Sequence, residues 1–458
     1  MKTRQELQNE AIRTVLDDRY VVLNWGTGVG KSRVAIGVID ELTRHEDATR
    51  ILLLVAETAH KNNWYREFVE ALGQQKADAL WSRMTVECYA SLPKYEWTSW
   101  DVIVADEAHH LRSENRSDII STMNAGYFLC LSATMSCDGD ADDLMRLLEM
   151  SNGEFRHLDF GIQDAIDNGI LKEPTIYAHF LSLDDFKKRQ EIVEKWGPKD
   201  KQVEITCDYE ELEKYTDRLT YPAAVLTIMA TPRQAYDYYT KKIECTKSIY
   251  KTAHASNHLA DGEENQYTEV LKTKIKRFGN LRKTVLGLSK TTFTRWLLDK
   301  RLQGKKYVCF CANVDQAKEL GGEYLICAEN GAANANTISA FNTDESDRLF
   351  AVGMAKEGLN LKGIQAGVVV QLGSKERDFV QEVGRAFRSD EPVQHVVVIA
   401  GTRDEDYYEK DIAVFKPKYI HKQYYGQAVK YKDMDRAAQM KPVEDPFLPG
   451  LARVAGAN

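Results

Sequence analysis

Residues 20–32 read YVVLNWGTGVGKS and contain the residue types that hold a phosphate group. A short apolar run stops at a glycine cluster, and a helical segment over about 32–43 follows. Glycines let backbone N–H groups close around phosphate oxygens without interference from Cβ atoms. Lys31 would reach the β- and γ-phosphates, and the Ser32 hydroxyl would ligate Mg²⁺. We therefore predict a phosphate-binding loop made of Gly26, Thr27, Gly28, Val29, Gly30, Lys31 and Ser32.

Trp25 is a departure from the general pattern G-x-x-x-x-G-K-[ST], because it occupies the position of the first glycine. The alternative interpretation of the whole segment is a glycine-rich turn between a strand and a helix that binds no ligand. The rest of the chain has to decide between the two.

A pair of carboxylates follows the loop by about 75 residues, in the sequence WDVIVADEAHH. Trp100 to Ala105 has the pattern of a buried strand, so Asp106 and Glu107 fall at its carboxyl end. Near a phosphate loop, Asp106 would hold Mg²⁺ and Glu107 would orient and deprotonate an attacking water. In isolation the pair could equally be an acidic strand end that caps a helix.

These residues require an α/β scaffold that brings strand ends together. The first ~175 residues alternate short apolar runs with amphipathic segments, which predicts a parallel sheet covered by helices on both faces. Charged, tyrosine-rich helical sequence then takes over, and strand–helix alternation returns from residue 307. We predict a first domain over 1–175, a mostly helical insertion over 183–287, a second α/β domain over 288–412 and a weakly ordered tail over 413–458.

The composition is that of a globular protein of two or three domains, with 458 residues, 43% hydrophobic and 28% charged. No apolar run approaches the ~20 residues of a membrane span, so we expect no membrane partner. The eight cysteines contain no C-x-x-C pair, which disfavours a zinc site or a disulfide framework and fits a reducing cytoplasm. The net charge of −8 speaks against a bulk nucleic-acid binder.

One stretch of the chain is strongly basic, in contrast to the negative net charge of the whole sequence. Twelve cations lie between Leu271 and Lys306 and only Asp299 opposes them. Phe278, Phe293 and Trp296 are interleaved with these cations. One interpretation is a nucleic-acid groove with stacking platforms, and the other is a helix pair that packs its aromatics inward. We expect a mixture, with the aromatics in the core and some of the cations on phosphates.

The loop G-x-G-K-S followed by D-E-A-H resembles the ATP-binding motifs of superfamily 2 helicases and translocases, and further family motifs appear in order. Residues 160–174 are similar to the segment that joins the two RecA-like domains in the branch of type III restriction subunits and phage recombination helicases. The resemblance covers about 5–175 and 285–400. It implies two tandem RecA-like parallel-sheet domains that sandwich the cofactors ATP and Mg²⁺.

The resemblance also implies roles for individual residues. Gln8 matches the glutamine that reads adenine, and Gly358 and Asn360 match further nucleotide contacts. The coupling of hydrolysis to domain movement would use Ser132, Ala133, Thr134 and Gln381. Arg385 and Arg388, in Q-x-x-G-R-x-x-R, would be arginine fingers on the γ-phosphate, although arginines at this spacing can also form a solvated helix face. Nucleic acid would be contacted by Thr58, Ala59, Tyr89, Ser91, Lys356, Glu357 and Gly358.

The resemblance implies an ATP-dependent DNA helicase or translocase, acting as a monomer in the cytoplasm of a bacterium or a phage-infected cell. DNA is preferred because the nearest resemblance is to DNA-acting branches, and the residues do not exclude RNA. The alternatives are an RNA helicase, a duplex-DNA translocase that never separates strands, and a non-motor nucleotide switch. The intact set Lys31, Asp106, Glu107, Arg385 and Arg388 disfavours the switch.

Overall fold

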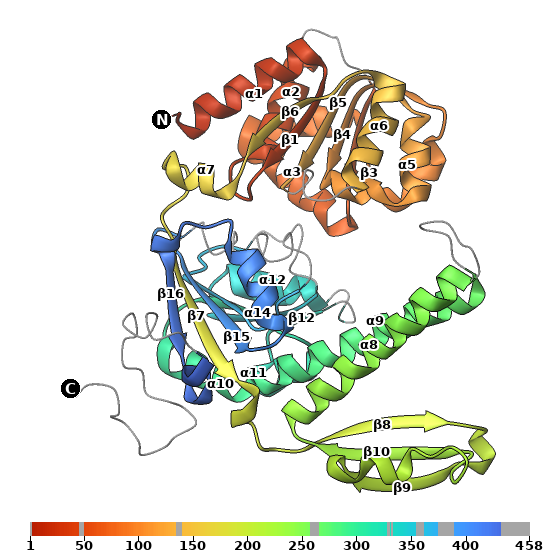
Figure 1. The fold of residues 1–458 in the computed structure, drawn as a ribbon. Coiled ribbons are helices and arrows are strands. Elements are labelled where there is room, and N and C mark those ends of the chain that lie inside the picture. The colour runs from red at the N-terminus through yellow and green to blue at the C-terminus, as the bar shows by residue number, and fades with distance from the viewer. Residues whose placement is uncertain are drawn as a thin grey trace.

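The computed structural model describes residues 2–44, 50–133, 140–256, 265–327, 330, 333–353, 361–373 and 389–431. Figure 1 shows two parallel sheets, of six and seven strands, and a long pair of helices that projects beside the second sheet. The predicted α/β class with two tandem parallel-sheet domains is confirmed. In the described part of the chain, no helix is both long and apolar enough to span a bilayer.

The first sheet has six parallel strands in the order β3-β2-β4-β5-β1-β6. The sequence predicted five of them and missed the half-exposed edge strand β6. The strands are β1 (Tyr20–Trp25), β2 (Ile51–Val55), β3 (Met84–Cys88), β4 (Ser99–Asp106), β5 (Asn124–Ser132) and β6 (Arg156–Phe160).

Helices cover both faces of this sheet, because alternate residues of its strands are buried in two different cores. Val21 and Leu53 pack on the side of α1, α2 and α3, whereas Val22 and Leu52 pack on the side of α5 and α6. The helices are α1 (Arg4–Asp18), α2 (Lys31–Arg44), α3 (Thr58–Leu72), α4 (Gln74–Trp81), α5 (Glu114–Ser121), α6 (Asp140–Asn152) and α7 (Ile162–Asp167), with the 3₁₀ segments η1 (Tyr89–Tyr95) and η2 (Ala108–Arg112).

The second sheet has seven parallel strands in the order β12-β13-β11-β14-β15-β7-β16. Its strands are β7 (Thr175–Ser182), β11 (Tyr307–Phe310), β12 (Leu325–Cys327), β13 (Arg348–Val352), β14 (Ala366–Val369), β15 (Val393–Ala400) and β16 (Ile420–Tyr424). The associated helices are α10 (Thr291–Arg301), α11 (Val314–Gly321), α12 (Ala333–Asn342) and α14 (Arg403–Ile412), with the 3₁₀ segments η7 (Pro417–Tyr419) and η8 (Gly426–Tyr431).

Two strands of this sheet come from parts of the chain that the sequence did not assign to it. β7 directly follows the first unit, and β16 lies in the range that was predicted to be a weakly ordered tail. The tail assignment is therefore wrong for residues 420–424, which pair along their length with β7. The short, polar sequence IHKQY gave no strand signal, because its only buried residue is Tyr424.

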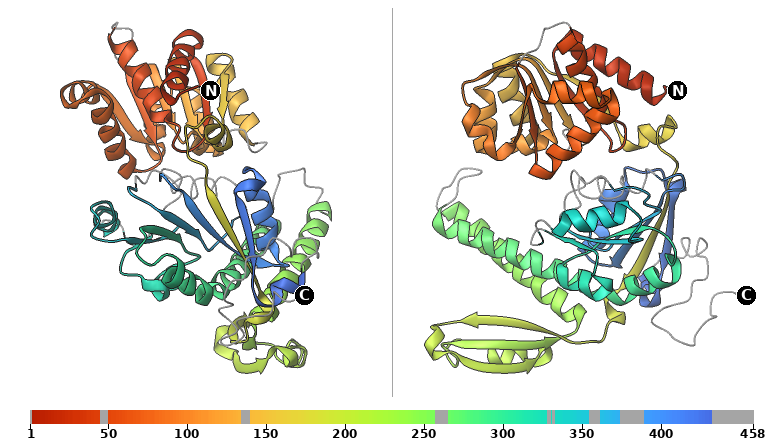
Figure 2. Two further views of the ribbon diagram at one scale, coloured as in Figure 1. Left: turned by 90° about the vertical axis from the view of Figure 1, so that its left-hand side faces the viewer. Right: turned by 180° about the vertical axis from the view of Figure 1, so that it is seen from behind.

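The segment between β7 and α10 contains the predicted helices and also a sheet that was not predicted. The two long helices α8 (Pro232–Ser256) and α9 (Gln266–Ser289) pack against each other as an antiparallel arm, which Figure 2 shows from two further sides. Before them, β8 (Gln190–Trp196), β9 (Val203–Asp208) and β10 (Ala224–Ala230) form a three-stranded sheet in the order β8-β10-β9, flanked by the 3₁₀ segments η3 (Leu183–Asp185), η4 (Lys199–Lys201) and η5 (Tyr209–Tyr215). The two edge strands are rich in charged residues, which hid their alternation.

The basic stretch from Leu271 to Lys306 divides between core and surface, as expected. Phe293 and Leu297 are fully buried. Lys290 is also fully buried, and its Nζ lies 2.6 Å from the buried Asp404 carboxylate, which fixes the base of the arm to α14. Four exposed cations lie farther out on α9, at Lys272, Lys274, Lys276 and Arg277. Further exposed cations of the stretch lie on or just after α10, at Arg295, Lys300, Arg301 and Lys305.

Candidate active site

The phosphate loop lies between the carboxyl end of β1 and the start of α2. Gly30 has a φ of +106°, and a Cβ there would lie 2.0 Å from the Gln8 side-chain nitrogen. Gly26 donates its N–H to the Phe160 carbonyl at 2.8 Å, and a Cβ there would lie 2.8 Å from the Ile162 nitrogen. Both positions therefore need glycine for the loop to keep this path.

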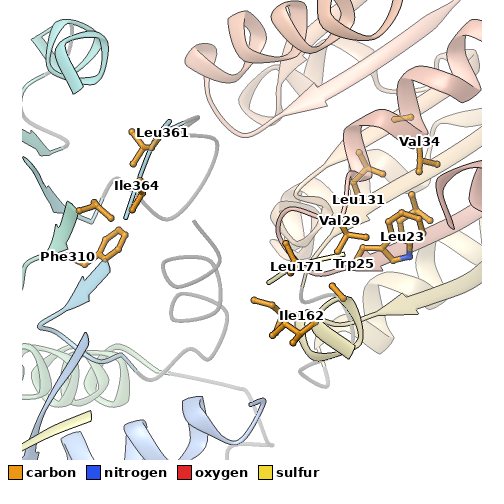
Figure 3. Close-up of a cluster of buried hydrophobic side chains, with 14 of the residues drawn as sticks. Leu23, Trp25, Val29, Val34, Leu131, Ile162, Leu171, Phe310, Leu361 and Ile364 are labelled. Atoms are coloured by element: carbon orange, nitrogen blue, oxygen red, sulfur yellow. The ribbon is translucent and has the colours of Figure 1, made fainter. Parts of the chain in front are cut away.

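Trp25 is compatible with the loop because its side chain is buried in the hydrophobic core below it. The ring is 2% exposed and packs in the core, 6.3 Å from the ring of Phe160. Figure 3 shows Trp25 and Val29 beside Ile162 and Leu171 of the following segment. Val29, which was predicted to bind the nucleotide, has a fully buried side chain, so only its backbone can face a ligand.

The two residues that end the loop begin helix α2. Lys31 is half-buried and donates from Nζ to the Trp25 carbonyl at 2.9 Å, so its ammonium folds back over the loop. Ser32 is half-buried in the first turn of the helix. Thr27 and Gly28 are half-buried in the loop itself. An ammonium and a hydroxyl at the positive end of a 14-residue helix fit a phosphate with its divalent cation.

Gln8 lies against the loop, as the sequence predicts. Gln8 lies on helix α1 and is 8% exposed. Its side-chain amide donates to the Val29 carbonyl at 3.0 Å. A capping box formed by Thr3 and Glu6 fixes the start of that helix. The glutamine is thereby positioned at the phosphate loop.

Asp106 ends β4, one strand removed from β1 across β5. Its Oδ2 accepts from the Trp64 indole N–H at 2.7 Å, and its Oδ1 accepts from the Glu107 N–H at 3.1 Å. Burial raises the pKa of this carboxyl to about 6, against the lowering effects of the Trp64 hydrogen bond and of the Lys31 charge. A bound divalent cation would favour the ionised form, so Asp106 fits the role of a metal ligand.

Glu107 has a backbone conformation that glutamate rarely adopts, with φ +49° and ψ +55°. Such strain is uncommon in non-glycine residues and gathers at functional sites. Its Oε2 lies 3.5 Å from Nδ1 of the buried His109. Because of this left-handed conformation, the Glu107 side chain leaves the backbone in a different direction from that of a residue that continued strand β4.

Ser132 and Ala133 lie at the carboxyl end of β5, on the same edge of the sheet as the phosphate loop and the two carboxylates. Ser132 is fully buried and pairs with Asn24 of β1. The third member of that motif, Thr134, lies outside the described residues. The structure thus brings the ends of β4, β5 and β1 together, which unites the phosphate loop, the carboxylate pair and the start of the coupling motif.

The residues predicted to bind nucleic acid in the first domain follow β2 and β3. Thr58 is exposed at the start of α3, where its Oγ1 lies 3.7 Å from Cys88 Sγ, and Ala59 follows it in that helix. Ser91 is half-buried in η1. Tyr89 is 1% exposed, and its hydroxyl donates to the Asp106 carbonyl at 2.6 Å. Its side chain therefore belongs to the core, so only its backbone could face nucleic acid, and its predicted contact stays a prediction.

The predicted residues of the second domain lie outside the described residues. They are Lys356, Glu357, Gly358, Asn360, Gln381, Arg385 and Arg388. Their roles stay predictions.

Trp64 is a site residue that the sequence reasoning missed. It lies between His60 and Phe68 at a spacing of four residues, and all three side chains are buried on one face of α3. That spacing predicts a helix face in the core. Only the tertiary structure shows that the indole N–H reaches Asp106.

Two family models match the sequence. The model described as the type III restriction enzyme res subunit matches residues 1–137, and the model described as the helicase conserved C-terminal domain matches residues 289–390. A search of curated proteins finds no match.

Solved structures with a similar fold include three proteins of low sequence identity. The Hef helicase domain of Pyrococcus furiosus is 15% identical, with a TM-score of 0.45, 90% of this chain covered and 99% of that one. The ATP-dependent type ISP restriction-modification enzyme LlaBIII bound to DNA is 12% identical, with a TM-score of 0.52. The match covers 94% of this chain and 32% of that one. A fragment of an HsdR subunit of a type I restriction enzyme from Vibrio vulnificus YJ016 is 15% identical, with a TM-score of 0.51 and coverages of 92% and 67%.

Proposed function

Because the chain belongs to superfamily 2 of the helicases, whose domains hydrolyse ATP, we propose that it is a DNA helicase or translocase. In this proposal ATP hydrolysis drives movement on DNA or its unwinding. The observation that carries it is the convergence of three strand ends. The phosphate loop after β1, the carboxylates after β4 and the coupling serine after β5 all lie on one edge of one parallel sheet.

The first domain supplies the groups that hold and hydrolyse ATP in this proposal. The loop N–H groups and Lys31 bind the phosphates, and Gln8, which lies against the loop, contacts the adenine. Ser32 and Asp106 would hold Mg²⁺, which when bound supplies positive charge to the phosphate oxygens. Glu107 orients the attacking water and accepts its proton.

The second domain completes the site on closure. Arg385 and Arg388 stabilise the negative charge that develops on the γ-phosphate. Gly358 and Asn360 contact the nucleotide, and Gln381 acts with Ser132, Ala133 and Thr134 to couple hydrolysis to the movement of the domains.

In this proposal nucleic acid is contacted at the end of the first sheet that β3 and β2 form. Thr58, Ala59 and Ser91 follow these strands and so lie to one side of the carboxylates after β4. Lys356, Glu357 and Gly358 would contact the nucleic acid from the second domain. DNA is the preferred substrate because LlaBIII, which has a similar fold, is bound to DNA in its structure. The exposed cations of α9 provide further phosphate contacts.

Steady-state ATP hydrolysis tests this proposal. We would measure turnover alone and with single-stranded DNA, duplex DNA, branched DNA and single-stranded RNA, at moderate salt. We expect stimulation by a DNA form and no turnover above background in Lys31→Ala, which loses the ammonium on the phosphates. Stimulation by RNA alone would identify an RNA helicase. Stimulation by duplex DNA without strand separation in a displacement assay would identify a translocase, and the absence of any stimulation would contradict a nucleic-acid motor.

A further inference from the structure

The peptide that joins Asp106 to Glu107 is held at both ends by hydrogen bonds. Its carbonyl accepts from the Tyr89 hydroxyl at 2.6 Å, and its N–H donates to the Asp106 carboxylate at 3.1 Å. The other carboxylate oxygen of Asp106 accepts from the Trp64 indole at 2.7 Å. Two aromatic side chains thus determine how both carboxylates are presented.

Both aromatic donors come from the segments that are proposed to grip nucleic acid. Trp64 lies six residues after Thr58 on the same helix, a rise of ~9 Å along its axis. Tyr89 lies two residues before Ser91 in η1. Each donor is nearly fully buried, at 3% and 1% exposure, so its position follows that of its own segment.

We propose that Trp64 and Tyr89 are positioning residues that transmit nucleic-acid binding from α3 and η1 to the carboxylates Asp106 and Glu107. This inference rests on the proposed function. Trp64 sets the orientation of the Asp106 carboxylate, which would hold the metal. Tyr89 sets the peptide plane before Glu107 and so supports the left-handed backbone of the glutamate.

The energetics favour such a role. A left-handed non-glycine residue is strained and persists only where its surroundings fix it. Buried hydrogen bonds to a carboxylate or to a strained peptide can supply part of that restraint. A small displacement of α3 or η1 on nucleic-acid binding can therefore shift the balance between productive and unproductive carboxylate geometry.

The test removes each donor and keeps an aromatic side chain at the position. Trp64→Phe and Tyr89→Phe each delete one hydrogen bond to Asp106. Two matched controls delete an equivalent bond in the same domain: Trp100→Phe loses the indole bond to Thr98 (2.9 Å), and Tyr20→Phe loses the phenol bond to the Ala125 carbonyl (3.2 Å). Turnover is measured with and without single-stranded and duplex DNA over a range of Mg²⁺ concentrations, and thermal unfolding is recorded for every variant.

We expect both test variants to unfold within a few degrees of their matched controls and to lose at least about ten-fold of the DNA stimulation ratio. Trp64→Phe should also need more Mg²⁺ for half-maximal turnover, a change that a packing defect alone would not produce. Trp64→Gln, which restores a side-chain N–H donor, should recover part of the loss.

The inference is overturned if the wild type is stimulated and the test variants keep the stimulation ratio and Mg²⁺ dependence of the controls. It is also overturned if basal and stimulated turnover fall by the same factor. If Trp64→Phe does not fold, the nearly isosteric Tyr89→Phe decides alone. A wild type that no nucleic acid stimulates would instead contradict the proposed function.

Discussion

Glu107 is the proposed general base, and its backbone is strained, with a φ of +49°. The sequence locates it at a strand end beside Asp106, the proposed metal ligand. Glutamate in that conformation is disfavoured unless neighbouring groups hold it, and the Tyr89 hydroxyl, which donates to the preceding carbonyl, is one such group. Strain of this kind gathers at functional sites, so it supports the proposed role.

Glu107→Gln should bind ATP and fail to turn it over. The amide has a similar shape but cannot accept the proton of the attacking water, so we expect turnover to fall by about 10²–10⁴-fold. Binding of a fluorescent ATP analogue and steady-state turnover would be measured side by side. Glu96→Gln, an exposed position in the same domain, is the control. Full turnover in Glu107→Gln would remove its assignment as the base.

At the scale of elements, the second sheet is closed at one edge by a strand that the sequence did not predict. The edge strand β16 pairs with β7, and a polar network centred on the buried His179 of β7 joins both strands to β15. His179 lies 2.9 Å from His395 and 3.0 Å from the Tyr425 hydroxyl, which in turn donates to Gln423. These bonds offset part of the cost of burying the two imidazoles.

The histidine pair predicts a pH dependence of stability. Burial, with smaller effects of Lys305 and Arg301, lowers the pKa of His395 to about 3, and burial also lowers the pKa of His179. The unfolded chain, with histidine pKa values near ~6.5, binds more protons between about pH 6.5 and 3. The stability that comes from keeping these histidines neutral in the folded state is therefore fully present above about pH 6.5 and is lost as the pH falls toward 3.

Between pH 7.5 and 5.5 His395 should lower the free energy of unfolding by about 1.3 kcal/mol, and His179 should act in the same direction. Urea unfolding of the wild type and of His395→Gln at the two pH values would measure this. The variant keeps a polar side chain but has no proton to gain, so its stability should change less with pH. His157→Gln, at an exposed position of β6, is the control. Equal pH dependence in wild type and His395→Gln would contradict the assignment.

At the scale of the whole molecule, the segment between the two sheets contacts both the phosphate loop and the end of the second domain. Phe160 accepts from the Gly26 N–H, and Leu171 packs 3.4 Å from where a Cβ of Gly28 would lie. On its other side, Asp167 and Glu173 form 2.6 Å ion pairs with Lys416 and Lys418. We expect a shift of the loop on ATP binding to reach the second domain through this segment.

Arg385→Ala tests whether the two domains form one active site. The proposed finger acts on the γ-phosphate only after closure, so ATP affinity in the first domain should persist while turnover falls by about 10³-fold or more. Arg348→Ala, at an exposed arginine of β13, is the matched control for a lost positive charge in the same domain. Nucleotide titration and turnover measure the two quantities, and unchanged turnover in Arg385→Ala would move the finger role to another residue.

The sequence alone determined the α/β class, two parallel-sheet units and the residues of the phosphate loop, because glycine clusters and apolar strands are local signals. It located Asp106 and Glu107 by the strand that precedes them. Only the tertiary structure assigned β7 and β16 to the second sheet, and only it revealed the small sheet β8-β10-β9. The edge strands β8, β9 and β16 bury few residues, so their sequences carry little periodicity. β7 is a buried interior strand, and its pairing with β15 and β16 joins segments that are far apart in the chain.

Long-range packing also decides the contacts of two side chains that the sequence did not indicate. Tyr89 resembled a nucleic-acid contact and lies in the core, whereas Trp64 resembled core packing and also bonds Asp106. Both facts depend on which helix face meets which strand end, at separations of 17 and 42 residues. Local residue types decide what chemistry a chain can perform. Long-range packing decides which side chains hold that chemistry in place.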